Sequence, residues 1–88
     1  MAKIVGIIKT SFIPKDSKVP VEGLSVYVTE PINPKRGEGV STDHFFLDKD
    51  KVSALNFTVS LNQEVEILYT KWGKVGSLRL IDEELDFN

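Results

Sequence analysis

The alternation of turn-forming and strand-forming residues is the feature that most restricts the fold of this chain. Runs rich in β-branched and aromatic residues are separated by clusters of proline, glycine, asparagine and aspartate, a spacing typical of short strands joined by loops. In the second run, Leu24, Val26 and Val28 alternate with residues of the opposite face, which indicates a strand with one buried side. The runs cover residues 3–13, 24–29, 40–47, 64–69 and 75–81, so the sequence predicts a mostly all-β domain.

A single stretch, which follows residue 47, fits a helix. Asp48 can serve as the N-cap, Asp50 places a negative charge in the first turn, and apolar residues follow at 52, 54 and 55. We expect about two helical turns at most, since the pattern ends before the next turn-forming cluster.

The predicted element order is three strands, a short helix and two strands. This is the chain order of an OB fold, a small five-stranded, partly open barrel with its helix between strands 3 and 4. Gly6 within the first long strand fits a bulge or bend that lets this strand serve both halves of the barrel. An SH3-like barrel or a small sandwich is the alternative. We expect one OB-like domain over residues 1–81 and an acidic C-terminal tail over residues 82–88.

Residue composition argues against catalysis. The chain has 88 residues, enough for one domain, and it contains no cysteine, which excludes a disulfide framework, a thiolate zinc site and a cysteine nucleophile. His44 is the only histidine, and its place in a strand beside Asp43 suggests a surface or half-buried residue. No glycine-rich phosphate loop lies between a strand and a helix. We therefore expect a protein that is not an enzyme and needs no cofactor or metal.

Apolar runs are too short for a membrane span, which needs roughly 20 residues. The first nine residues reach Lys9 too soon for the apolar segment of a signal peptide, and they fit a strand instead. We expect a cytoplasmic protein that does not contact a membrane.

Charge is divided unevenly along the chain. The formal net charge is −2, but the last seven residues hold four of the 13 acids, which leaves 11 bases against 9 acids in residues 1–81. The tail fits a solvated chain end. Alternatively, Leu85 and Phe87, which lie between its acids, dock on a protein partner.

Trp72 is the most informative residue for function. It falls in a predicted hairpin turn between Lys71 and Lys74, where a large apolar ring is unexpected. One interpretation is that the ring folds back and caps the core. The other is that it stacks on an unpaired base while the lysines meet phosphates. In an OB fold this turn joins strands 4 and 5 and flanks the binding face.

Further basic residues fall at positions that suit a nucleic-acid track. Lys15 and Lys18 lie in the predicted loop between strands 1 and 2, the other loop that flanks an OB binding face. Tyr27 lies on the strand face opposite Leu24, Val26 and Val28, where it either covers the sheet or stacks on a base. Three more cations could extend the track: Lys9, Lys35 and Arg36.

Two resemblances support this interpretation. Residues 37–40 (GEGV), 45–47 (FFL), 64–69 (EVEILY) and 72–75 (WGKV) resemble short uncharacterised proteins of plasmids, phages and integrative elements of Gram-positive bacteria, which are often encoded near replication genes. The size, the β content and the residues Gly76-Ser77-Leu78 are similar to the single-stranded DNA-binding proteins of filamentous phages. That resemblance implies an OB-fold homodimer that coats DNA through aromatic and basic residues.

The tail is also similar to the acidic tail of bacterial single-stranded DNA-binding proteins, which recruits partners through a terminal hydrophobic residue. Here Phe87 lies one place before the end. The sequence thus predicts a protein that binds single-stranded nucleic acid, with DNA favoured, and that serves replication or transfer of a mobile element. A replication protein would bind the tail. The rival prediction is a protein-interaction module that uses a sheet edge or the loop over residues 31–39 and binds no nucleic acid.

Overall fold

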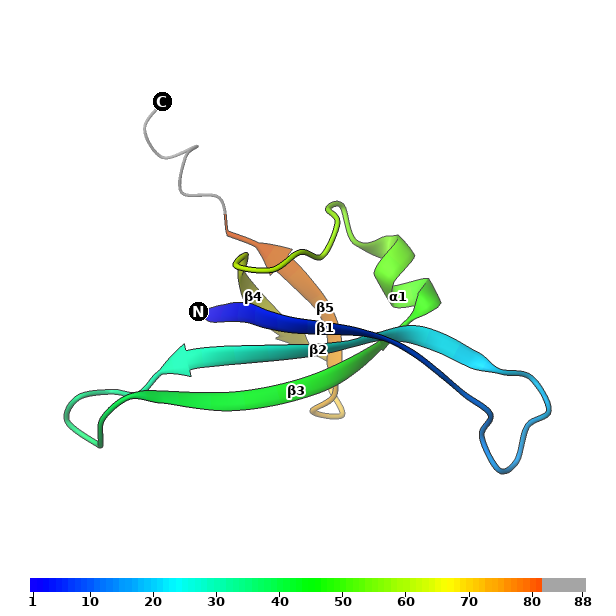
Figure 1. The fold of residues 1–88 in the computed structure, drawn as a ribbon, viewed down its shortest axis with the longest axis horizontal. Coiled ribbons are helices and arrows are strands. Elements are labelled where there is room, and N and C mark those ends of the chain that lie inside the picture. The colour runs from blue at the N-terminus through cyan, green and yellow to red at the C-terminus, as the bar shows by residue number, and fades with distance from the viewer. Residues whose placement is uncertain (82–88) are drawn as a thin grey trace.

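The computed structural model describes residues 1–81, which form a five-stranded antiparallel sheet and one short helix (Figure 1). The elements are β1 (Ala2–Phe12), β2 (Val21–Pro31), β3 (Val40–Asp48), α1 (Lys49–Ala54), β4 (Glu64–Tyr69) and β5 (Val75–Leu80). The predicted β class, the five strands and the helix between strands 3 and 4 are therefore confirmed.

The long strands β1, β2 and β3 form a meander, and β2 reaches further at both ends than the predicted 24–29. Strand β2 pairs with β1 as far as Phe12 and Val21, and with β3 as far as Pro31 and Val40. The pairing partners thus extend β2 into residues whose own composition favours a loop. Beyond it, the amide of Ile32 donates to the carbonyl of Gly39 at 3.0 Å and closes the β2–β3 loop.

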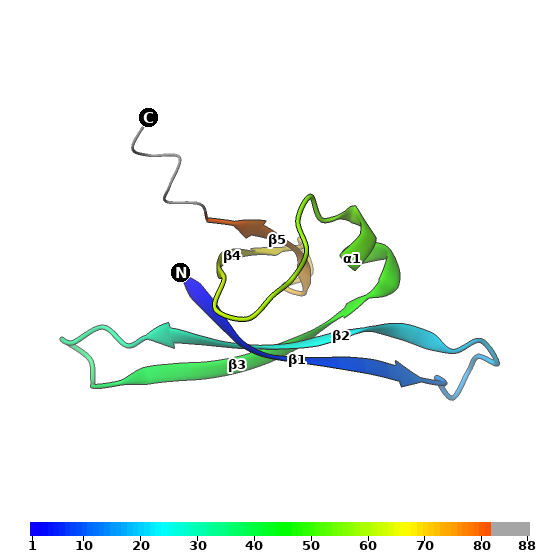
Figure 2. The same ribbon diagram turned by 45° about the horizontal axis from the view of Figure 1, so that its top comes forward.

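The strand order is β3-β2-β1-β4-β5, so β3 and β5 are the two edges of the sheet. The sheet folds over, and β4, β5 and α1 lie above one face of the three long strands (Figure 2). Strands β3 and β5 approach each other, but no ladder joins them in the described part of the chain. The sheet is not closed, so the predicted barrel is not confirmed.

Strand β1 pairs with β2 from Lys3 to Phe12 and also with β4 at its start, and Gly6 lies at an irregularity in the pairing with β2. Its register with β2 shifts between Ile4 and Gly6, which is the predicted bulge. Only Ala2 and Lys3 pair with β4. A Cβ added to Gly6 would lie 3.3 Å from the Cβ of Tyr27, so a side chain here would crowd the neighbouring strand.

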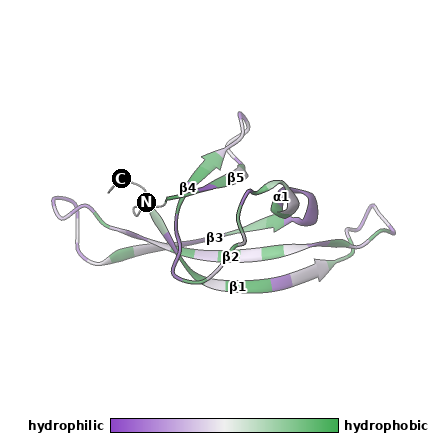
Figure 3. Ribbon diagram, turned by 90° about the horizontal axis from the view of Figure 1, so that it is seen from above, coloured by the Kyte–Doolittle hydropathy of each residue, from purple (hydrophilic) through white to green (hydrophobic). Residues whose placement is uncertain are grey.

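The core lies between the two layers. Ile4, Val26 and Leu47 from the long strands are fully buried against Val65 and Leu78 of the β4–β5 hairpin. Figure 3 shows the hydrophobic residues along the strands, whereas the β2–β3 loop is largely hydrophilic.

Helix α1 begins where the sequence predicted. The Asp48 carboxylate accepts a hydrogen bond from the amide of Lys51 at 2.9 Å, which satisfies one of the free N–H groups of the first turn. The predicted N-cap is therefore confirmed.

Candidate nucleic-acid interface

The β4–β5 turn is held by hydrogen bonds that centre on Thr70. Its amide donates to the carbonyl of Lys74 at 2.7 Å, and its carbonyl accepts from the amide of Gly73 at 3.0 Å. The Thr70 hydroxyl also accepts from the amides of Trp72 and Lys74, at 3.3 and 3.4 Å. Gly73 adopts a φ of +77°, which suits glycine and is typical of a three-residue hairpin loop. The backbone that presents Trp72 is thus well defined by local bonds.

The indole ring of Trp72 points into solvent. Trp72 is 75% exposed, and the ammonium of Lys71 lies 4.7 Å from the centroid of the indole ring. At this distance a cation and the negative face of an indole attract each other. The ring does not cap the core, so the first interpretation of this residue is wrong.

The predicted basic residues do not form one continuous patch. Lys15 and Lys18 lie in the β1–β2 loop, whereas Lys35 and Arg36 lie in the β2–β3 loop at the opposite end of the long axis (Figure 1). The Trp72 turn extends from the other layer, between these two ends. A chain that touched all three places would have to run along much of the molecule.

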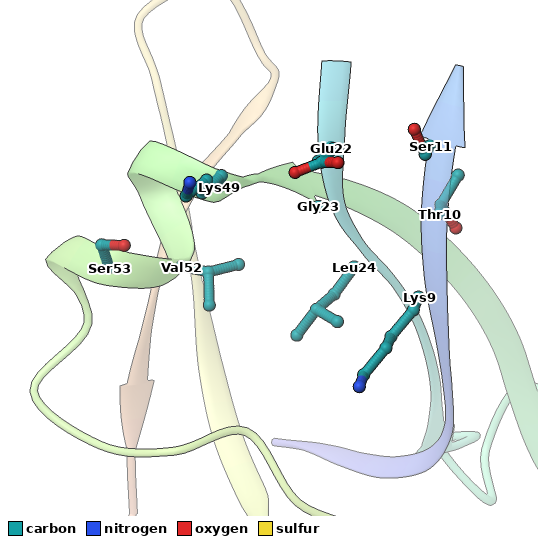
Figure 4. A pocket seen from close by; sticks show the side chains of 9 residues that line it. All are labelled: Lys9, Thr10, Ser11, Glu22, Gly23, Leu24, Lys49, Val52 and Ser53. Atoms are coloured by element: carbon teal, nitrogen blue, oxygen red, sulfur yellow. The ribbon is translucent and has the colours of Figure 1, made fainter. Parts of the chain in front are cut away.

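Lys9 belongs to a different surface, a groove of about 440 Å³ between α1 and the ends of β1 and β2 (Figure 4). Leu24 and Val52 face each other across it, and Lys49 supplies a second cation. Glu22 lies at the same rim, so the groove has mixed charge. The sequence predicted Lys9 as part of the nucleic-acid track, but it gave no indication of Lys49 or of this groove.

Tyr27 lies on what we call the outer face, the side of β1, β2 and β3 that points away from the core. Its ring stacks on the His44 ring, with centroids 5.4 Å apart. The predicted position opposite the buried residues of β2 is confirmed. The outer face also carries Ile8, Thr10, Phe12, Ser25 and Phe46.

A second aromatic pair extends the outer face along the strands. The rings of Phe12 and Phe46 meet edge to face, with centroids 5.6 Å apart, and the hydroxyls of Thr10 and Ser25 bond at 2.7 Å. The sequence predicted His44 as a surface or half-buried strand residue and indicated no functional role for Phe46. Side chains alternate between the two faces of a strand, so the predicted strand over residues 40–47 already indicated that His44 and Phe46 lie on one face of β3.

Charge is nearly absent from the outer face. Between Lys3 at one end and Asp48 at the other, these strands direct no charged side chain to that side. Their charged residues face the opposite layer, where Glu30 and Asp43 line a small hollow with Ile67. The outer face is therefore apolar and aromatic, with hydroxyl groups between the rings.

Other kinds of site find little support within residues 1–81. No three histidine, cysteine, aspartate or glutamate side chains there could hold one metal ion. In the same range no helix is long and apolar enough to cross a membrane. The predicted partner-binding residues Leu85 and Phe87 lie outside the described residues.

Comparison of the chain with family models, curated proteins and solved structures finds no match.

Proposed function

We propose that this protein binds single-stranded nucleic acid, with DNA favoured, through the β4–β5 turn and the basic loops. It would act without catalysis in the cytoplasm, in the replication or transfer of a mobile element. The single observation that carries this proposal is the exposed Trp72 ring under the Lys71 ammonium. An indole with a free face is a platform for any unpaired base, because every base has a π-face.

The arrangement of strands supports an OB-like domain as the scaffold. An OB fold is itself partly open, and its binding loops join strands 1 to 2 and strands 4 to 5. Here the loop between β1 and β2 carries Lys15 and Lys18, and the loop between β4 and β5 is the turn that carries Lys71 and Lys74. The sheet differs from a barrel because its edge strands β3 and β5 approach each other without forming a ladder.

Duplex DNA hides the faces of its bases, so we expect the protein to bind a single strand more tightly than a duplex. Few cations are available to contact phosphates, so log K should fall by only about 3–4 per tenfold rise in salt. Fluorescence anisotropy with labelled single- and double-stranded oligonucleotides, at two salt concentrations, measures both quantities. Absence of an anisotropy change at low salt and tens of micromolar protein would refute the proposal.

The tail should weaken this binding at low salt. Its acids compete with nucleic acid for the basic loops, and salt screens that competition beyond about 8–10 Å. Removal of residues 82–88 changes the net charge from −2 to +2. The truncated protein should therefore bind a single strand more tightly at low salt, and the gain should fade at high salt.

Parallel anisotropy titrations of the full-length and truncated proteins test the tail prediction. A full-length variant with Asp82, Glu83, Glu84 and Asp86 changed to Asn or Gln is the matched control, because it keeps the tail but removes its charge. It should match the truncation. Equal affinities of the full-length and truncated proteins at low salt would show that the tail has no such effect.

A further inference from the structure

We propose that the groove between α1 and the ends of β1 and β2, which we call the α1 groove, binds a short extended peptide of a partner protein. The peptide carries apolar side chains of about the size of leucine, with carboxylates between them. This proposal does not rest on nucleic-acid binding.

The α1 groove is left open by the incomplete pairing of β1. Strand β4 pairs with β1 only at Ala2 and Lys3, so in residues 1–81 it gives no cover to the stretch 9–11 that lines the groove. Helix α1 forms the opposite wall (Figure 4). The enclosed volume of about 440 Å³ lies within the range of roughly 300–1,000 Å³ that is typical of ligand sites. The groove is therefore formed before any partner binds.

The floor of the α1 groove is aliphatic. Leu24 of β2 and Val52 of α1 face each other across it, and both are only half-buried (Figure 4). The same two residues line a neighbouring hollow of about 460 Å³ together with Leu55, Phe57 and Val59, so the two spaces adjoin along α1. In an extended chain, side chains two residues apart point the same way at a spacing of about 7 Å. Two apolar side chains of one peptide can therefore occupy the groove and the hollow.

Two lysines without an ionic partner lie above this floor. Lys9 projects from β1 and Lys49 from α1, whereas in residues 1–81 the only ion pair joins Arg79 to Glu66. Glu22 is the one acid among the lining residues, so the α1 groove carries more positive than negative charge. Carboxylates between the apolar side chains of a bound peptide would meet the two ammonium groups. The charge of the walls thus complements an acidic peptide.

The aliphatic lining favours a peptide over a nucleic acid. Single strands are held by the stacking of bases on aromatic rings, and none of the described residues that line the α1 groove is aromatic. Lys9 then serves this groove and no longer extends the predicted nucleic-acid track. The Trp72 turn and the basic loops contribute no residue to the groove or to the adjoining hollow, so they remain free for a single strand.

The acidic tail of the same chain is the competing occupant, but its reach is short. Ile81 donates its amide to the carbonyl of Glu64, the partner of Lys3 in the ladder. Lys9 lies six residues further along β1, which is about 20 Å at the spacing of a strand. A fully extended chain carries Leu85 at most about 14 Å from Ile81. Leu85 therefore stops short of the Lys9 wall, whereas a separate peptide has no such limit.

Fluorescence anisotropy of the full-length protein with a labelled heptapeptide tests the proposal. In this peptide two leucines alternate with three aspartates between terminal glycines. We expect saturable binding with a Kd of about 10–500 µM, because the contact is far smaller than a standard interface. Two changed peptides are the controls, one with serine for leucine and one with lysine for aspartate. Each should bind at least about tenfold more weakly, because the first loses its apolar contacts and the second brings like charges together.

Lys9→Glu should weaken peptide binding by about tenfold, because the change replaces an attraction with a repulsion of similar size. The matched control is Lys3→Glu, which makes the same change of charge at an exposed position of β1 outside the α1 groove. It should bind the peptide as the unchanged protein does. Lys49→Glu tests the opposite wall, and a negative charge there suits the first turn of the helix. Thermal melting shows whether each variant folds.

Several results would overturn the proposal. They are the absence of saturable binding by the full-length protein, equal binding of the three peptides, and equal effects of Lys9→Glu and Lys3→Glu. Peptide binding that appears only after removal of residues 82–88 would assign the α1 groove to the tail. A fall in oligonucleotide affinity that matches the fall in peptide affinity in Lys9→Glu would assign it to nucleic acid. Peptide binding by a protein that binds no oligonucleotide would support this proposal and refute the nucleic-acid one.

Discussion

Trp72→Ala should weaken single-strand binding by about 1–3 kcal/mol, the usual loss for one base stack, which is a factor of roughly 5–150 in Kd. The ring is 75% exposed and its turn is held by Thr70, so its removal should leave the melting temperature almost unchanged. Anisotropy titration and thermal melting of the same sample measure the two effects together.

Two control variants sharpen the Trp72 test. Trp72→Phe keeps an aromatic face and should retain most of the affinity. Leu61→Ala removes an exposed apolar side chain away from the turn, and it should bind as the unchanged protein does. A large fall in melting temperature with unchanged binding would show that the indole stabilises the fold instead.

Gly23→Ala should destabilise the fold by about 3 kcal/mol, the upper part of the usual range for overpacking, and lower the melting temperature by about 12–24 °C. Gly23 lies opposite Asp48 in the ladder between β2 and β3. An added Cβ would collide with the carbonyl oxygen of Leu47 and lie 2.8 Å from the Cα of Asp48. Since backbone atoms cannot turn aside as a flexible side chain can, the strands would have to separate.

Gly37→Ala is the matched control for this substitution. It adds the same methyl group in the β2–β3 loop, where the nearest atom is a side-chain carbon of Ile32 at 3.3 Å. Its melting temperature should stay within a few degrees of the original, because the Ile32 side chain can shift. Equal melting of the two variants, followed by circular dichroism, would show that β2 and β3 are not packed as closely as described.

Local residue chemistry was sufficient to predict most of the fold. The Asp48 cap and the Gly6 bulge depend on immediate neighbours, and both are confirmed. Strand β2 extends beyond the predicted 24–29 because its ends are set by pairing with β1 and β3, which composition does not show. Whether β3 and β5 pair depends on how far the whole sheet curls, which no single segment determines.

The candidate site was predicted only in part. Trp72 could be singled out by its place in a lysine-flanked turn, since both features are local, but the sequence left open whether its ring is exposed or caps the core. The outer face could not be predicted, because Phe12 meets Phe46 only through the register of three strands that are joined by two long loops. Long loops leave that register open, and a shift of one residue would send each side chain to the other face.

The partial pairing of β1 has a mechanical consequence for the β4–β5 hairpin. Only Ala2 and Lys3 join its ladder to the long strands, helped by two backbone hydrogen bonds between Ile4 and residues 62 and 63. Elsewhere the hairpin is attached by apolar side-chain contacts, which are non-directional. The hairpin is therefore anchored mainly by the burial of Val65 and Leu78, so the loss of an apolar side chain there would release the Trp72 turn while the ladders of the meander stay intact.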